Sequence, residues 1–158
     1  MNLINGTSRW FLNYSLGMRS LGLVVIFAFL TLTSLSQIKF PHLKNESFTY
    51  DQAIEELTKL SNVSPYIEII EQGKTDVGRR LHTVVFNFNK EFDPTKIDRS
   101  KKAVLLINNA IHPGESCGVD ATVKLFEYLS THEKEFENLI VVAIPVYNIG
   151  GMLNRSKY

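Results

Sequence analysis

Two continuous apolar runs constrain the fold of this chain more than any other feature. They cover Ala103 to Ile107 (AVLLI) and Leu139 to Val146 (LIVVAIPV). Uninterrupted runs of this kind are typical of strands that are covered on both faces. The segment between them, Ser116 to Thr131, has a helical apolar stripe made of Val119, Val123, Phe126 and Leu129. A strand, a helix and a strand in this order predict a right-handed crossover with two parallel strands.

A second group of elements is predicted before this crossover. Thr49 to Leu60 (TYDQAIEELTKL) has apolar residues at helical spacing behind a threonine cap. Tyr66 to Glu71 and Leu81 to Phe88 are predicted strands, and Gln72 to Arg80 contains two glycines that suit the turn of an antiparallel hairpin. The residues after Tyr147 are predicted to form a loop. The fold class is therefore α/β, with a mixed, mostly parallel central sheet and flanking helices.

Length and composition narrow the functional classes. The chain has 158 residues, 44% of them hydrophobic, and a formal net charge of +1. This length suits one domain, and the near-neutral charge predicts no nucleic-acid partner. The single cysteine, Cys117, excludes an internal disulfide and a cysteine-rich zinc finger. We expect Cys117 to pack the first turn of a helix rather than to act as a nucleophile.

Residues 1–36 differ from the rest of the chain in charge and hydropathy. They contain no Asp or Glu, and Leu21 to Leu32 (LGLVVIFAFLTL) is an uncharged apolar run preceded by Arg19. A basic flank, a short apolar core and a small-x-small exit (SLS) predict a secretory signal peptide, with an uncleaved membrane anchor as the alternative. We expect residues 37–158 to be exported, as a secreted or periplasmic domain, or to be associated with a membrane through residues 21–36.

One short motif has the residue types and spacing of a metal site. His112-Pro113-Gly114-Glu115 lies in the loop between the first apolar run and the following helix. Open α/β sheets place their ligand sites in loops at the carboxyl ends of strands. The His-x-x-Glu spacing puts an imidazole and a carboxylate within reach of one ion, and Pro-Gly suits a tight turn between them. Taken alone, the four residues also suit a plain polar turn with Glu115 near a helix N-terminus.

Four stretches resemble the start of the zinc metallocarboxypeptidase family, the carboxypeptidase A/B type. In the order of the family they are FTYDQAIEELTKL, IEQGKTDVGRRLHTVVF, AVLLINNAIHPGES and IVVAIPVYNIGG, which together span residues 48–151. The resemblance implies that residues 37–158 are the N-terminal part of a catalytic domain with a zinc carboxypeptidase-like fold, incomplete at the C-terminus. It also implies a Zn²⁺ cofactor, His112 and Glu115 as two of the three zinc ligands, and hydrolysis of C-terminal residues from peptides or peptide-like substrates.

The chain departs from the family in the rest of the site. The family's third ligand is a His far downstream, and neither His82 nor His132 lies where it belongs. The family's general-base Glu has no counterpart here, so no catalytic residue is assigned. Asn154-Arg155 comes too soon after the preceding strand to match the family's Asn-Arg pair. We therefore expect this chain alone to lack peptidase activity, because the metal would be weakly held and its base absent.

Three other interpretations stay open. In the first, the chain is a noncatalytic remnant or binding module. In the second, it is a zinc-dependent amidohydrolase or deacylase of the same broad fold. In the third, it is a structural membrane-anchored domain in which the HPGE loop is only a turn. A continuation that carries the His, the Asn-Arg pair and the Glu would favour the peptidase over the deacylase.

Two expectations concern packing. Asp120 lies off the apolar stripe of its helix, and we expect it to be solvated. The apolar runs at 103–107 and 139–146 need cover on both faces, and a chain that stops at Tyr158 leaves one face or edge of the sheet bare. A bare edge of this kind is an aggregation hazard.

Overall fold

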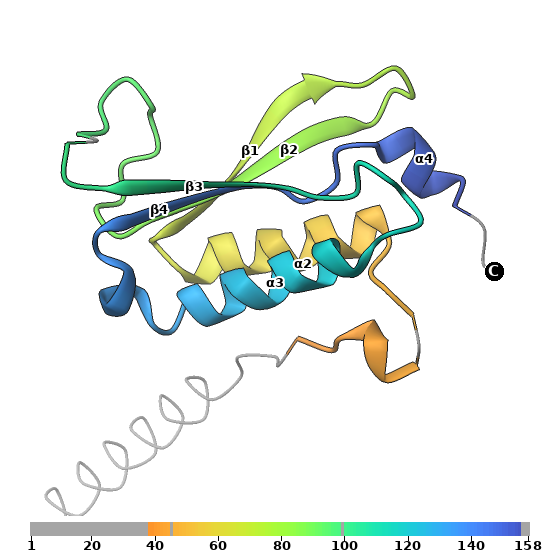
Figure 1. Ribbon diagram of the computed structural model, residues 1–158, viewed down its shortest axis with the longest axis horizontal. Coiled ribbons are helices and arrows are strands. Elements are labelled where there is room, and N and C mark those ends of the chain that lie inside the picture. The colour runs from red at the N-terminus through yellow and green to blue at the C-terminus, as the bar shows by residue number, and fades with distance from the viewer. Residues whose placement is uncertain (1–37, 45, 99, 156–158) are drawn as a thin grey trace, which may run out of the picture. The chain divides into compact units, whose positions relative to one another are not determined.

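A computed structural model describes residues 38–44, 46–98 and 100–155 of the chain (Figure 1). The residues from Lys39 onward belong to one compact unit. The predicted signal peptide or anchor, residues 1–36, lies outside the described residues. Within the described part of the chain, no helix is long and apolar enough to cross a membrane.

The first long helix, α2 (Tyr50–Val63), begins at the predicted cap. The Gln52 amide donates to the Thr49 hydroxyl at 3.3 Å, and the Thr49 amide donates to the Gln52 side chain at 2.9 Å. This reciprocal pair satisfies two main-chain donors that the helix itself leaves free. The buried face consists of Tyr50, Ala53, Leu57 and Leu60. The prediction of this helix is confirmed, and the helix continues to Val63.

Four strands form a single sheet in the order β1-β2-β4-β3. β1 (Ile67–Lys74) and β2 (Arg80–Asn87) make the predicted antiparallel hairpin. β3 (Ala103–Asn108) and β4 (Leu139–Ile144) are parallel, joined by α3 (Cys117–Leu129). The strand–helix–strand unit is therefore confirmed.

The prediction of a mostly parallel sheet is wrong. Only β3 and β4 pair in parallel, whereas β2 pairs antiparallel with both β1 and β4. The hairpin is one physical reason, because its short turn makes β1 and β2 run in opposite directions, so at most one of them can be parallel to β4. The described sheet is mixed, with two antiparallel strand pairs and one parallel pair.

The core lies between the sheet and the helices α2 and α3, which cover one of its faces (Figure 1). Phe86 pairs with Val141, and Val84 pairs with Ala143, so these four side chains share a face. All four are completely buried. The predicted stripe of α3 is also completely buried, at Val119, Val123, Phe126 and Leu129. This layer of apolar side chains is the main source of stability.

β3 is exposed, although its sequence predicts cover on both faces. The exposed fractions are 52% for Val104, 44% for Leu105 and 66% for Leu106. The prediction of cover is therefore wrong for β3, whereas half of the residues of β4 are buried and none is exposed. β3 lies at the edge of the described sheet, and the bare edge expected from the sequence is the free side of this strand.

The chain after Tyr147 forms a short helix, α4 (Ile149–Leu153), where a loop was predicted. Asn148 caps it, because its side-chain oxygen accepts from the Gly151 amide at 2.9 Å. Two adjacent glycines in this segment lower its helix propensity, which explains the wrong prediction. Two 3-10 turns, Pro41–Lys44 and Glu133–Phe136, complete the helical elements among the described residues.

Candidate metal-binding loop

His112 and Glu115 lie in the loop between β3 and α3, at the carboxyl end of β3, as the sequence predicted. The Glu115 amide donates to the His112 carbonyl at 3.0 Å, which closes a tight turn. The turn brings His112 Nδ1 to 3.6 Å from Glu115 Oε2. The two side chains are 78% and 77% exposed. They are therefore adjacent and open to solvent.

The amino-terminal part of this loop is fixed by the segment that joins β4 to α4. The Tyr147 amide donates to the Asn109 carbonyl at 2.9 Å, and the Asn148 amide donates to the Ala110 carbonyl at 3.1 Å. The Asn148 side chain also donates to the Ile111 carbonyl at 3.4 Å. Ala110 has a φ of 50°, a conformation that costs energy for a residue with a Cβ. These three hydrogen bonds hold the backbone in that conformation, directly before His112.

Close packing fixes the loop on two further sides. The Asn109 amide group donates to the hydroxyl of Thr122, a buried residue of α3. On the other side, Gly151 of α4 lies so close to the loop that a Cβ there would be 2.6 Å from Cγ of Pro113. Only glycine fits this approach without a shift of the loop. The base of the His112 turn is thus held, while its tip is exposed.

The donor atoms of His112 and Glu115 are of kinds that zinc binds. Zinc binds His nitrogen and Glu oxygen at about 2.0–2.1 Å, so two such ligands of a tetrahedral ion lie about 3.3 Å apart. The observed separation of 3.6 Å between His112 Nδ1 and Glu115 Oε2 is close to this value. Among the described residues, however, no group of three or more His, Cys, Asp or Glu side chains is placed to hold one ion. The two residues fit a zinc ion, but they need further ligands.

The other histidines considered at the sequence level lie away from this loop. His82 is a residue of β2, and its Nδ1 is 3.2 Å from the Tyr50 hydroxyl, which also donates to the Arg80 carbonyl at 2.5 Å. Burial lowers the pKa of His82 and raises the pKa of Tyr50. His132 stacks on Tyr128 with ring centroids 3.9 Å apart. Each histidine has a local structural contact of its own.

One packing expectation is wrong, and a second is met only in part. Cys117, expected to pack the first helical turn, is exposed at the start of α3. Asp120, expected to be solvated, accepts a hydrogen bond from the Phe48 amide at 2.9 Å. The partner of Asp120 is far away in the sequence, so no local pattern points to it.

Arg155 supplies a second link to the same segment. Its guanidinium donates to the carbonyls of Ser47 at 3.0 Å and Phe48 at 3.3 Å. Together with Asp120, it fixes the chain directly before α2. Sequence reasoning did not identify this role, because an Asn-Arg dipeptide in a predicted loop carries no signal for a contact with the other end of the domain.

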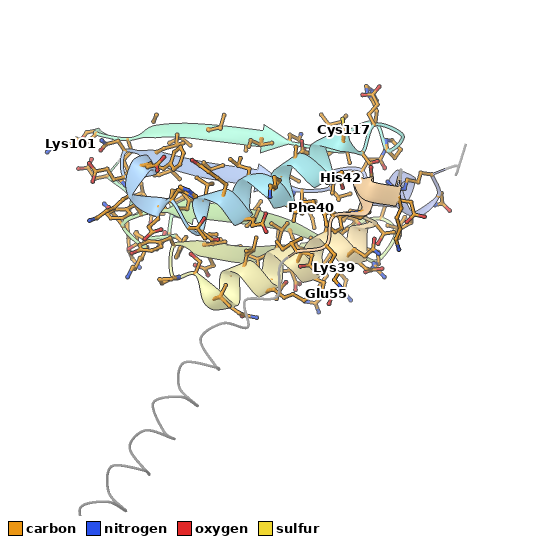
Figure 2. All side chains as sticks on the ribbon, turned by 90° about the horizontal axis from the view of Figure 1, so that it is seen from below. Lys39, Phe40, His42, Glu55, Lys101 and Cys117 are labelled. Atoms are coloured by element: carbon orange, nitrogen blue, oxygen red, sulfur yellow. The ribbon has the colours of Figure 1, made fainter. Side chains whose placement is uncertain are left out.

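A shallow hollow of about 630 Å³ lies away from the His112 turn, between the residues before α2 and the first half of α3. It is lined by Phe40, His42, Glu46, Ser47, Cys117, Asp120, Ala121 and Lys124. Figure 2 shows Phe40 and His42 beside α3, with Cys117 at the start of that helix. The Lys124 ammonium lies 5.0 Å from the centre of the Phe40 ring, a cation–π contact. Neither His112 nor Glu115 lines this hollow.

Taken together, the described residues define a mixed α/β sheet covered by two helices, with a His-x-x-Glu turn at the carboxyl end of an edge strand. No protein-family model matches the sequence, and no curated protein matches it. Solved structures do resemble its fold. The carboxypeptidase A from Helicoverpa armigera matches with a TM-score of 0.55 and 20% identity, over 68% of this chain and 26% of that one.

A second solved structure gives the same result. The metallo-carboxypeptidase from Burkholderia cenocepacia matches with a TM-score of 0.52 and 20% identity, over 66% of this chain and 28% of that one. The chain thus aligns with only about a quarter of the length of these structures. At this identity the similarity establishes a metallocarboxypeptidase-like fold and leaves the activity to be proposed.

Proposed function

We propose that this chain is the N-terminal part of a zinc-dependent metallocarboxypeptidase, with His112 and Glu115 as two of its three zinc ligands. One observation carries the proposal. The two side chains lie next to each other, 3.6 Å apart, on a loop at the carboxyl end of β3 whose base is fixed by hydrogen bonds and close packing. The fold similarity to carboxypeptidases supports the reaction class.

The residues around the turn would position the two ligands. Asn148 and Asn109 hold the backbone on either side of Ala110, so His112 leaves the sheet in a fixed direction. A bound zinc ion supplies Lewis acidity that polarises a scissile carbonyl and lowers the pKa of water. The high exposure of His112 and Glu115 gives a peptide C-terminus free access to that position. Export through residues 1–36 is part of the proposal and rests on the basic flank and apolar run.

The completed site needs residues from polypeptide that this chain does not contain. The third ligand and the general base would come from there, because the described residues offer no third donor at the turn. In this chain alone, two ligands would bind zinc weakly and the peptidase reaction would not proceed. The exposure of His112 and Glu115, and the lack of a third metal ligand among the described residues, favour one alternative, a noncatalytic metal-binding module.

Zinc titration of the full chain, followed by NMR of the histidine ring protons, tests the assignment. We expect weak binding that shifts the His112 signals and leaves those of His82 and His132 in place. His112→Ala should weaken binding at least about tenfold, because it removes one of only two ligands. Glu115→Gln should weaken it in the same direction, because the neutral amide lacks the carboxylate charge.

The matched control is His132→Ala, which removes an imidazole outside the turn. Zinc affinity that is equal in the His112→Ala and His132→Ala proteins would contradict the assignment of His112. Peptidase activity of this chain alone would contradict the claim that the base and third ligand lie elsewhere.

A further inference from the structure

The turn between β1 and β2, residues 75–79, is tied to the start of α2. Within the turn, the Arg79 carbonyl accepts from the amide and the hydroxyl of Thr75, at 2.8 and 2.9 Å. The Arg79 guanidinium is paired with the Asp51 carboxylate and lies 4.9 Å from the centre of the Tyr50 ring, a cation–π contact. The hairpin turn is therefore closed by its own hydrogen bonds and held against the first turn of a helix.

α4 packs against this hairpin turn on one side and against the loop between β3 and α3 on another (Figure 1). A Cβ on Gly150 would be 2.9 Å from Cγ1 of Val77, in the hairpin turn. A Cβ on Gly151 would be 2.6 Å from Cγ of Pro113, in the loop. Successive residues lie about 100° apart around a helix, so the two glycines face different neighbours. Each glycine permits an approach that a side chain would block.

α4 is also joined to the backbone directly before His112. The Asn148 side chain accepts from the Gly151 amide at 2.9 Å and donates to the Ile111 carbonyl at 3.4 Å. On the other side of His112, Pro113 has the close contact with Gly151 described above. The position of α4 therefore acts on the chain at both residues that flank His112.

We infer that Val77 is a positioning residue for the His112 turn, acting through α4. Its side chain limits how far α4 can move toward the hairpin, and so keeps Gly151 against Pro113. Val77 is 42% exposed in a turn, where polar residues are usual, so burial alone does not account for valine there. Its branched side chain is stiff and suits such a contact.

The consequence for metal binding rests on the function proposed above. Groups that orient the ligands of a metal commonly change its affinity by about 10–100-fold. Val77 touches neither His112 nor Glu115 and acts one contact further away, so we expect a smaller effect, about threefold. The orientation of His112 itself can be followed without any metal, which separates the positioning role from the zinc assignment.

A pair of compensating substitutions tests the inference in the full chain. Gly150→Ala adds a Cβ against Val77, so α4 should shift and the NMR signals of the His112 ring and of Pro113 should move in the zinc-free protein. Val77→Ala removes the two methyl groups that this Cβ meets, at 2.9 and 3.8 Å. The double variant should therefore return these signals toward their wild-type positions. Zinc affinity should follow, about threefold weaker in Gly150→Ala and restored in the double variant.

Gly151→Ala is the matched control, because its Cβ meets Pro113 and Asn148 instead of Val77. We expect it to move the His112 signals as well. Adding Val77→Ala should leave that change in place, since the new contact does not involve Val77. Restoration confined to the Gly150→Ala background is a result that a general loss of stability would not produce.

A second measurement applies even if Gly150→Ala does not fold. Val77→Ala alone leaves a gap beside Gly150, so α4 should hold the loop less firmly. We expect the Asn148 amide, which donates to the Ala110 carbonyl, to exchange about threefold faster. Val63→Ala makes the same change at an exposed position at the end of α2 and should leave this rate unaltered.

Three outcomes overturn the inference. Gly150→Ala may move the signals of Val77 and leave those of His112 in place, which would mean that the valine turns aside. Val77→Ala may restore both glycine variants equally, or may leave exchange of the Asn148 amide unchanged. Failure of the proposed function is separate: restored His112 signals together with zinc binding that ignores His112→Ala would keep the positioning role and remove its link to a metal.

Discussion

β4 and β3 are neighbouring parallel strands with similar apolar sequences, yet their surroundings differ. β4 has a strand on each side, and its central residues Val141 and Ala143 are completely buried. In the described sheet β3 has a strand on one side only, and three of its large apolar side chains are exposed. The difference teaches that an apolar run indicates a strand suited to burial, whereas the strands and helices that bury it are determined by other parts of the chain.

The largest difference in stability is expected when a carboxylate is placed at paired positions of β4 and β3. Val141→Asp should lower the free energy of unfolding by about 3–5 kcal/mol, because it buries an unpaired carboxylate. Leu105→Asp changes the residue that pairs with Val141, but its side chain reaches water. We expect a loss of about 1 kcal/mol or less. Urea unfolding of both variants measures the contrast, and equal losses would mean that β3 is covered in solution.

A smaller difference in stability is expected between substitutions in the segments that follow the two strands. Gly151→Ala, in the helix after β4, would place a Cβ 2.6 Å from Pro113 and 2.9 Å from Asn148, so we expect a loss of about 1–3 kcal/mol. Gly114→Ala, in the turn after β3, meets nothing within 4 Å and should stay within about 0.5 kcal/mol of the wild type. Thermal unfolding compares them. A large loss from Gly114→Ala would show that the tip of the turn is packed.

The smallest effect is expected in the pH dependence of stability. It involves His82 of β2, the other neighbour of β4. Burial holds the pKa of His82 below its ordinary value of 6.5. Above pH 6.5 the His82 imidazole is mainly neutral in both the folded and the unfolded chain. As the pH falls below it, the unfolded chain takes up the proton first, so the free energy of unfolding should decrease. His82→Gln should flatten this part of the pH profile. An unchanged slope in the variant would assign the pH dependence to another group.

Much of the fold was predictable because its signals are local. The helical spacing from Tyr50 to Leu60, the glycine turn of the hairpin and the stripe of α3 each depend on neighbouring residues, and all three were predicted correctly. Strand order and cover were not predictable in this way. They depend on which distant strands meet, so the mostly parallel sheet and the covered β3 were wrong.

The candidate site was predictable only in part. The position of His112 and Glu115 at a strand end follows from the motif and its flanking elements. The groups that support the turn do not, because Asn148 reaches it from a later segment that the sequence predicted to be a loop. The links from Asp120 and Arg155 to the segment before α2 connect residues far apart in the sequence, and no period or motif encodes them.

The antiparallel seam between β2 and β4 has a consequence for how the chain folds. β1 and β2 are joined by a short turn, and β3 pairs with β4 across α3, as Ala103 does with Leu139, so each group closes a shorter loop than the seam does. The seam instead joins residues such as Asn87 and Ile140, with the whole of β3 and α3 in the closed loop. Non-local pairing carries a larger closure entropy and slows folding. The two groups are therefore expected to form first, and their union at this seam to limit the rate at which the native sheet appears.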